Sequence, residues 1–237
     1  MKPIEKRIDK IDWPTVGEEL HQKGYAIISK FLSKESCKTL LALYDQPEGY
    51  RKKVVMARHR FGLGEYKYFD YPLPDLIETI RSKVYPYLAP IANSWMRVLR
   101  TGKSFPSALD DLRKLCLDNR QDKPTPLILR YEKGGFNTMH QDLYGEVYFP
   151  MQLVLFLNEP GMDYEGGEFV LIQQTPRAQS KAIVLTPRKG DMLIFPTNFR
   201  PAKGNNGYYR AAMKHGVSEL HSGKRHTLGI IFHDAQS

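Results

Sequence analysis

The feature that most constrains the fold of this chain is a series of short β-type runs after residue 127, separated by turn residues. Glycine pairs and Gly-Asp steps punctuate these runs. Closely spaced short strands with such turn signals are typical of an antiparallel sandwich or barrel. We therefore predict a jelly-roll from about residue 127 to the end. The runs are 127–131, 151–157, 168–172, 182–185, 192–195 and 227–232.

The first half of the chain has apolar residues at helical spacing. Pro86 and Pro90 should bend or interrupt the longest of the expected helices. The prediction is an α+β protein in which a helical and mixed segment, 1–126, packs on a catalytic segment, 127–237, and its helices brace the core. The expected helices are 15–22, 33–44 with Ser33 as N-cap, 76–98 and 107–117. Residues 54–57 and 66–69 should pair as a hairpin around a glycine turn.

Bulk composition limits the classes of protein but does not choose a function. No apolar run of about 18 residues is present, so no membrane span is expected. Two cysteines, Cys37 and Cys116, are too few for a disulfide framework, and we expect a cytoplasmic protein with reduced thiols. The net charge of +9 would attract nucleic acid, and it would equally suit a basic pocket for an anionic co-substrate.

Three candidate metal ligands stand in the β-rich half. His140 and Asp142 are two positions apart, and His215 follows much later. Because alternate residues of a strand face the same side, His140 and Asp142 should point together into the barrel, with Gln141 pointing away. Two imidazoles and one carboxylate on one side of a metal leave other positions open, which is the ligand set of non-haem Fe(II) oxygenases.

An arginine follows the distal histidine at a spacing that suits a carboxylate anchor. Arg225 stays charged and offers a fork of donors that matches a carboxylate. Thr227 shares its strand parity and could add a hydrogen bond, and Tyr131, before the His140 turn, could supply a third donor. The alternatives are a surface ion pair for Arg225, an ordinary strand residue for Thr227 and a core aromatic for Tyr131.

These residues carry a resemblance to a known family. From about residue 127 onward the chain resembles the Fe(II)/2-oxoglutarate-dependent dioxygenases, in their prolyl-hydroxylase-like branch. Over its whole length it also resembles a bacterial oxygenase family presumed to act in oxidative demethylation of damaged DNA. The matching segments are 129–131, 140–142, 155–158, 166–169, 189–195 and 215–217, together with Arg225.

The resemblance implies a double-stranded β-helix core and a set of cofactors. Fe(II) would be held by His140, Asp142 and His215, and the distal carboxylate of 2-oxoglutarate, the co-substrate, by Arg225. With O2, such an enzyme hydroxylates a C–H bond of its substrate and releases succinate and CO2.

The substrate stays open between two kinds of polymer, nucleic acid and protein, with a small free metabolite as a third alternative. The long stretch 196–210 is basic and aromatic and leads to His215, so we expect it to border the pocket, and the basic segments 51–53 and 58–64 could form another wall. Both suit phosphate contacts with base stacking, or a peptide. The alkylation-repair demethylases carry a second arginine in the pattern RxNxxxR. Its absence after Arg225 favours a hydroxylase-type site and a protein side chain such as proline.

Two other classes compete with this reading: a non-catalytic, cupin-like module that binds a metal or small ligand, and a zinc-dependent hydrolase with the same ligands. Neither has a need for a carboxylate anchor beside the metal, so Arg225 discriminates against both.

Overall fold

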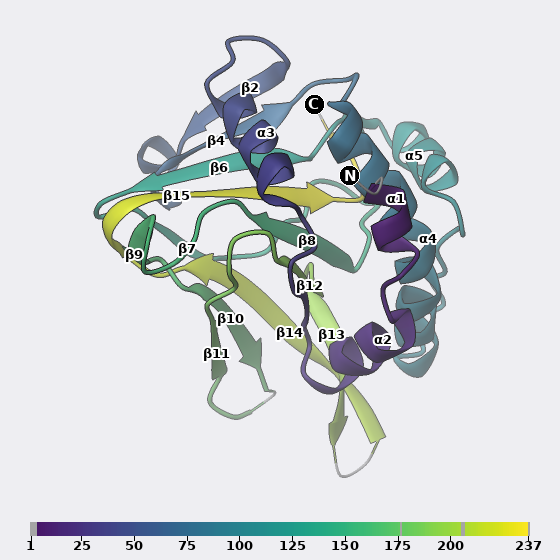
Figure 1. The fold of residues 1–237 in the computed structure, drawn as a ribbon. Helices are drawn as coiled ribbons and strands as arrows, with labels where there is room; N and C mark the ends of the chain where they lie inside the picture. Colours follow the sequence, from purple (N-terminus) through teal and green to yellow (C-terminus); the bar gives the residue numbers. More distant parts are fainter. Residues whose placement is uncertain (1–3, 176, 205–206, 237) are drawn as a thin grey trace.

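The computed structural model of the chain describes residues 4–175, 177–204 and 207–236. Within these ranges, two large antiparallel sheets face each other, and helices cover the outer face of the larger sheet (Figure 1). This arrangement confirms the predicted α+β class, with a jelly-roll core and bracing helices. In the described part of the chain, no helix is long and apolar enough to cross a membrane.

The larger sheet contains most of the predicted strands, and the smaller sheet faces it. In order, the larger sheet has β1 (Ala26–Ile28), β12 (Met192–Pro196), β8 (Met151–Phe156), β15 (Leu220–Ile231), β6 (Leu127–Glu132), β4 (Glu65–Phe69) and β2 (Tyr50–Val55), with β9 (Tyr164–Gly166) also paired to β15. The smaller has β11 (Lys181–Leu185), β10 (Phe169–Gln174), β14 (Gly207–Val217), β7 (Phe136–His140) and β3 (Gly62–Leu63), with β13 (Phe199–Gly204) paired to β14. A short ribbon joins β16 (Ala235–Gln236) to β5 (Gln121–Lys123).

The helices come from the first half of the chain, as expected, but strands from that half also enter both sheets. Strands β1, β2 and β4 extend the larger sheet, and β3 extends the smaller one. The division of the chain at residue 126 stays a prediction. The helices are α1 (Ile4–Ile8), α2 (Trp13–Gln22), α3 (Lys34–Tyr44), α4 (Asp75–Val98) and α5 (Leu109–Asp118), with a 3-10 turn η1 (Met56–His59) before β3. Ser33 caps α3 by accepting from the Ser36 N–H.

Strand β8 shows why its sequence is apolar at every position except Gln152. Leu153 and Leu155 pack in the core beneath the helices, whereas Val154 and Phe156 pack between the two sheets. Because successive side chains of a strand face opposite sides, a strand covered on both faces reads as a continuous apolar run. This double burial places β8 and its neighbour β15 in the middle of the protein.

Helix α4 runs through both of its prolines, so the expected interruption is wrong. Pro86 and Pro90 are exposed and stand four positions apart, on the side of the helix that faces water. Water can therefore satisfy the carbonyls that lose a partner at each proline. The opposite face is fully buried, and it includes Val84, Tyr85 and Leu88. This packing outweighs the local cost of the prolines.

A buried histidine just beyond the end of β15, His233, is expected to make the free energy of unfolding sensitive to acid. His233 is fully buried, its Nδ1 accepts from the Phe149 N–H, and burial lowers its pKa to about 4. The unfolded chain, with a histidine pKa near 6.5, binds a proton before the folded protein does. The free energy of unfolding therefore has its full value above about pH 6.5, and up to about 3 kcal/mol of it is lost as pH falls toward 4.

We expect the free energy of unfolding, measured in urea at a series of pH values, to fall across this window. His233→Gln keeps an acceptor for Phe149 but does not titrate, so its curve should fall less steeply. Parallel curves for the two proteins would show that His233 does not cause the acid sensitivity.

Candidate metal and co-substrate site

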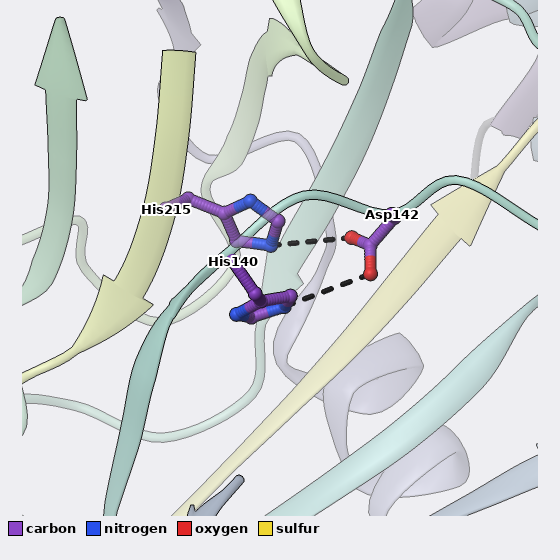
Figure 2. Close-up of side chains that lie close together, drawn as sticks. All are labelled: His140, Asp142 and His215. Atoms are coloured by element: carbon purple, nitrogen blue, oxygen red, sulfur yellow. Dashed lines mark ion pairs between the residues drawn. The ribbon is translucent and has the colours of Figure 1, made fainter. Parts of the chain in front are cut away.

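Strands β7 and β14 of the smaller sheet bring the two candidate histidine ligands together. His140 is the last residue of β7 and is in register with His215 in β14. Asp142 lies beyond the end of β7, in an irregular segment, so the expectation that one strand presents both His140 and Asp142 is wrong. The chain leaves the sheet after His140 and turns the carboxylate back toward both rings (Figure 2).

The three side chains converge on one point. His215 Nε2 lies 3.2 Å from one carboxylate oxygen of Asp142, and His140 Nε2 lies 3.6 Å from the other (Figure 2). The two imidazole rings have their centroids 4.2 Å apart. One ligand atom from each of the three residues can be chosen so that all lie within 4.8 Å of one another. A single ion can therefore contact all three residues.

The orientation and electrostatics of these side chains suit a divalent cation. His140 Nδ1 lies 2.7 Å from the Thr138 carbonyl, to which it donates, so Nε2 is the ring nitrogen that faces Asp142. Burial, with His140 second, lowers the pKa of His215 and favours its neutral form. Burial alone would raise the pKa of Asp142, but the nearby His215 and His140 side chains, with hydrogen bonds from His215 and Tyr144, hold it well below its usual range. Two imidazole nitrogens and one carboxylate that face one another form a donor set that fits a divalent metal ion.

Neighbouring side chains fix this arrangement. Tyr144 donates a hydrogen bond of 2.8 Å to Asp142 Oδ1, and burial, with the Asp142 charge second, raises the pKa of Tyr144 well above its ordinary value. Gln141 donates to the carbonyls of Asn198 and Met213, at 2.8 Å in each case. It therefore ties the Asp142 segment to the strand that carries His215. We did not predict Tyr144, whose only sequence signal is its position two residues after Asp142.

Arg225 is buried on the larger sheet, facing the metal candidates across one cavity. It is 1% exposed and stands opposite Tyr131 in the β15–β6 register. Thr227, two residues on, is also buried and lines the same cavity, which has a volume of about 210 Å³. All the predicted site residues, His140, Asp142, His215, Tyr131, Arg225 and Thr227, line this cavity.

The guanidinium of Arg225 has unused hydrogen-bonding capacity. Among the residues that the structure describes, its Nε and Nη1 have no hydrogen-bond partner. Aromatic rings surround it, with the centroids of Tyr131, Phe156 and Tyr164 at 5.6, 5.5 and 6.0 Å from its central carbon. Cation–π contacts offset part of the cost of burying this charge, but an anion would satisfy it more fully.

Gly167 and Tyr131 adapt the cavity to this arginine. A Cβ on Gly167 would lie 2.5 Å from Leu220 and 3.1 Å from Arg225 Cδ, so the glycine leaves room for the arginine. Burial raises the pKa of Tyr131 to about 12, against the opposing charge of Arg225. The Tyr131 hydroxyl therefore stays protonated as a donor, and Asn137 donates to its oxygen at 3.3 Å.

The described residues of the stretch 196–210 do not border this cavity, contrary to expectation. Most of it forms the hairpin of β13 and β14, which projects away from the sheets (Figure 1), and none of its described residues lines the cavity. Arg200 is buried and binds Gln173 and the His21 carbonyl, so it anchors the hairpin to α2 and β10. Asn205 and Asn206, within the same stretch, lie outside the described residues.

Comparison with known proteins places this geometry in a family. Residues 64–235 match the model of a family described as "Oxygenase, catalysing oxidative methylation of damaged DNA". The chain is also 38% identical over 190 residues to an uncharacterised protein of Mycobacterium tuberculosis, a match that covers 78% of this chain and 82% of the relative. The same match is found in a second strain of that organism.

Solved structures show the same fold at low sequence identity. An oxidoreductase of the 2OG-Fe(II) oxygenase family from Burkholderia pseudomallei has a TM-score of 0.57 at 15% identity, covering 96% of this chain and 95% of its own. A Pseudomonas putida prolyl-4-hydroxylase has a TM-score of 0.52 at 16% identity, covering 95% and 100%. A Trichoplax adhaerens prolyl hydroxylase, solved with a hypoxia inducible factor peptide fragment, has 0.53 at 16%, covering 98% and 92%.

Proposed function

Because this chain belongs to the oxygenase family described as catalysing oxidative methylation of damaged DNA, we propose that it is an Fe(II)- and 2-oxoglutarate-dependent dioxygenase that hydroxylates a C–H bond of a polymer. Membership of this oxygenase family identifies the chain as an oxidoreductase. The structure adds a donor set of two histidines and one aspartate that fits Fe(II).

The observation that carries the proposal is the buried, unsatisfied guanidinium of Arg225 in the same cavity as this donor set. A dicarboxylate that reaches the metal with one end and Arg225 with the other would satisfy both. A cupin-like binding module or a zinc hydrolase has no need of an unpaired buried arginine beside its metal. The combination therefore favours 2-oxoglutarate as co-substrate.

Each side chain has a distinct task in this reaction. His140, Asp142 and His215 would hold the iron through two neutral imidazoles and one carboxylate. Arg225 would bind the distal carboxylate of 2-oxoglutarate, with the Thr227 and Tyr131 hydroxyls as further donors. When bound, iron with 2-oxoglutarate and O2 supplies the oxidising chemistry, which converts the co-substrate to succinate and CO2 and inserts an oxygen atom into the substrate C–H bond.

The burial of Arg225, Thr227 and Tyr131 would also strengthen binding of the co-substrate. Arg225, Thr227 and Tyr131 are each at most 3% exposed, so the co-substrate end of the cavity is shielded from bulk water. Shielding strengthens each charge-assisted hydrogen bond to the distal carboxylate.

We place the reaction in the cytoplasm, because buried free thiols at Cys37 and Cys116 suit a reducing compartment.

Succinate release tests this function. Iron-loaded protein is given 2-oxoglutarate and O2, alone and with single-stranded DNA, duplex DNA, RNA or a proline-containing peptide. We expect succinate in the presence of iron, with a higher rate when one polymer is added, and none after chelation of the metal. Failure of the iron-loaded protein to bind 2-oxoglutarate would contradict the proposal and favour the cupin-like module.

A further inference from the structure

A short basic and aromatic segment lies beside the entrance to the cavity. Arg58, His59, Arg60 and Phe61 are consecutive, and all four are exposed. Within residues 4–175, 177–204 and 207–236, neither Arg58 nor Arg60 forms an ion pair, whereas Lys53 and Arg130 nearby in the fold both pair with Glu65. The segment therefore presents two uncompensated positive charges to solvent.

The segment is fixed to the strand that carries His140. The Phe61 carbonyl accepts hydrogen bonds from the Thr138 N–H at 2.9 Å and from the Thr138 hydroxyl at 3.0 Å. Gly62, the next residue, is in register with Asn137, and a Cβ there would lie 2.2 Å from the Phe136 carbonyl oxygen. Only glycine permits so close an approach. The arginines therefore keep a defined position relative to the metal candidates.

The ring of Phe61 connects this surface to the cavity. It is 46% exposed, it lines the cavity, and it stacks on His59 with the ring centroids 5.4 Å apart. Further in, Tyr66 and Tyr68 also line the cavity, and the guanidinium of Arg51 lies 4.4 Å from the centre of the Tyr68 ring. A large apolar ring that stays half in water at the mouth of a cavity is a ready contact for a flat ligand group.

We propose that Arg58, Arg60 and Phe61 dock single-stranded nucleic acid at this entrance, with phosphates on the arginines, one base on Phe61 and a neighbouring unpaired base directed into the cavity. This inference rests on the function proposed above and names the form of its substrate. Exposed cations without acidic partners suit phosphates, and base–aromatic stacking tolerates any sequence. A base in a duplex cannot enter a cavity between two sheets until it leaves its stack.

A peptide fits this surface less well. Proline-containing peptides carry no regular negative charge that would match two free arginines, while each nucleotide brings one phosphate. The net charge of +9 acts in the same direction, because it attracts polyanions over a longer range. A strongly acidic peptide is the competing ligand, and the experiment includes it.

The test measures binding by fluorescence anisotropy with the full chain and three labelled probes: a single-stranded oligonucleotide, the same sequence as a duplex, and an acidic peptide. We expect the single strand to bind most tightly. The double variant Arg58→Gln/Arg60→Gln should weaken it about 10-fold or more and reduce the slope of log K against log[salt] by about 1.4, since each single-strand phosphate contact contributes about 0.7.

A matched control removes the same charge elsewhere. Arg97 and Arg100 are also exposed, stand at the end of α4, and do not line the cavity. Arg100 even shares the left-handed backbone of Arg60, with φ of 52° against 59°. Arg97→Gln/Arg100→Gln should leave the affinity within about 2-fold. Equal losses in both double variants would show that net charge alone drives binding and would overturn the proposal.

Phe61 provides the second part of the test. Phe61→Ala should weaken single-strand binding by about 10-fold with the salt dependence unchanged, and Phe61→Tyr should restore it, because stacking needs only a ring. Unchanged affinity in Phe61→Ala, tighter binding of the duplex, or tighter binding of the acidic peptide would each overturn the docking surface.

Binding of 2-oxoglutarate to the iron-loaded wild type is measured separately. If 2-oxoglutarate does not bind, the proposed function alone is contradicted. If 2-oxoglutarate binds but nucleic-acid affinity is unchanged in the Arg58, Arg60 and Phe61 variants, this inference alone is contradicted.

Discussion

Replacing Arg225 with methionine is expected to weaken 2-oxoglutarate binding about 100-fold or more, because a buried charge-assisted contact is typically worth several kcal/mol. The same change should leave the free protein at least as stable as the wild type. The guanidinium is 1% exposed and two of its nitrogens have no partner among the described residues, so it costs free energy in the absence of an anion. Methionine keeps an unbranched side chain of similar length among the surrounding rings.

Arg130→Met is the matched control for this prediction. Arg130 stands on the neighbouring strand and is not among the residues that line the cavity, and its guanidinium pairs with Glu65 at 2.7 Å. The pair is partly exposed, so its removal should lower the free energy of unfolding by about 1 kcal/mol or less and leave 2-oxoglutarate affinity unchanged.

Calorimetric titration of 2-oxoglutarate and urea unfolding without ligand measure the two effects on each variant. A stable Arg225→Met protein that still binds 2-oxoglutarate at the wild-type level would place the carboxylate anchor elsewhere. Marked destabilisation of the ligand-free Arg225→Met protein would show that the arginine has a structural partner.

Asp142→Asn should abolish iron-dependent succinate release. The amide has the shape of the carboxylate but lacks the negative charge that faces both imidazoles, so the loss should exceed the 10- to 100-fold range typical of residues that only support a metal ligand. Iron content per protein and succinate release measure the two consequences, and circular dichroism checks the fold. Wild-type turnover in Asp142→Asn would exclude the aspartate as a ligand.

Tyr144→Phe gives a graded counterpart. It removes the 2.8 Å hydrogen bond to Asp142 but leaves all three donor groups in place. We expect iron affinity to fall about 10- to 100-fold, with turnover recovered at high iron concentration. A loss that excess iron does not recover would mean that Tyr144 acts on a step other than metal binding.

The chemistry of the site could be predicted from the sequence because it depends on residue identity at fixed spacings. His140, Asp142, His215 and Arg225 were identified from their residue types and spacing, and all four line one cavity. Arg225 and Thr227 were predicted to face the same side of one strand, and both line the cavity because β15 is regular at that point. For Arg225 and Thr227, the alternation of side chains along a strand was sufficient.

Other features depend on contacts that no local pattern records. Pro201 and Gly204 suggest a loop, yet β13 forms because β14 pairs with it through the backbone. Asp142 keeps its place although β7 ends before it, because Tyr144 and Gln141 hold the segment from the side. Whether Arg225 was buried and unpaired, or exposed and paired, was decided by strands distant in sequence.

The distribution of the site over the two sheets has an evolutionary consequence. The histidines belong to the smaller sheet, and Arg225, Thr227 and Tyr131 belong to the larger one. Selection can therefore alter one half of the site without disturbing the strands of the other. A descendant that lost Arg225 would keep the three candidate metal ligands, and one with another residue at that position could bind a different ligand beside them. Each of the two sheets thus contributes its own set of residues to the cavity, and each set can change separately.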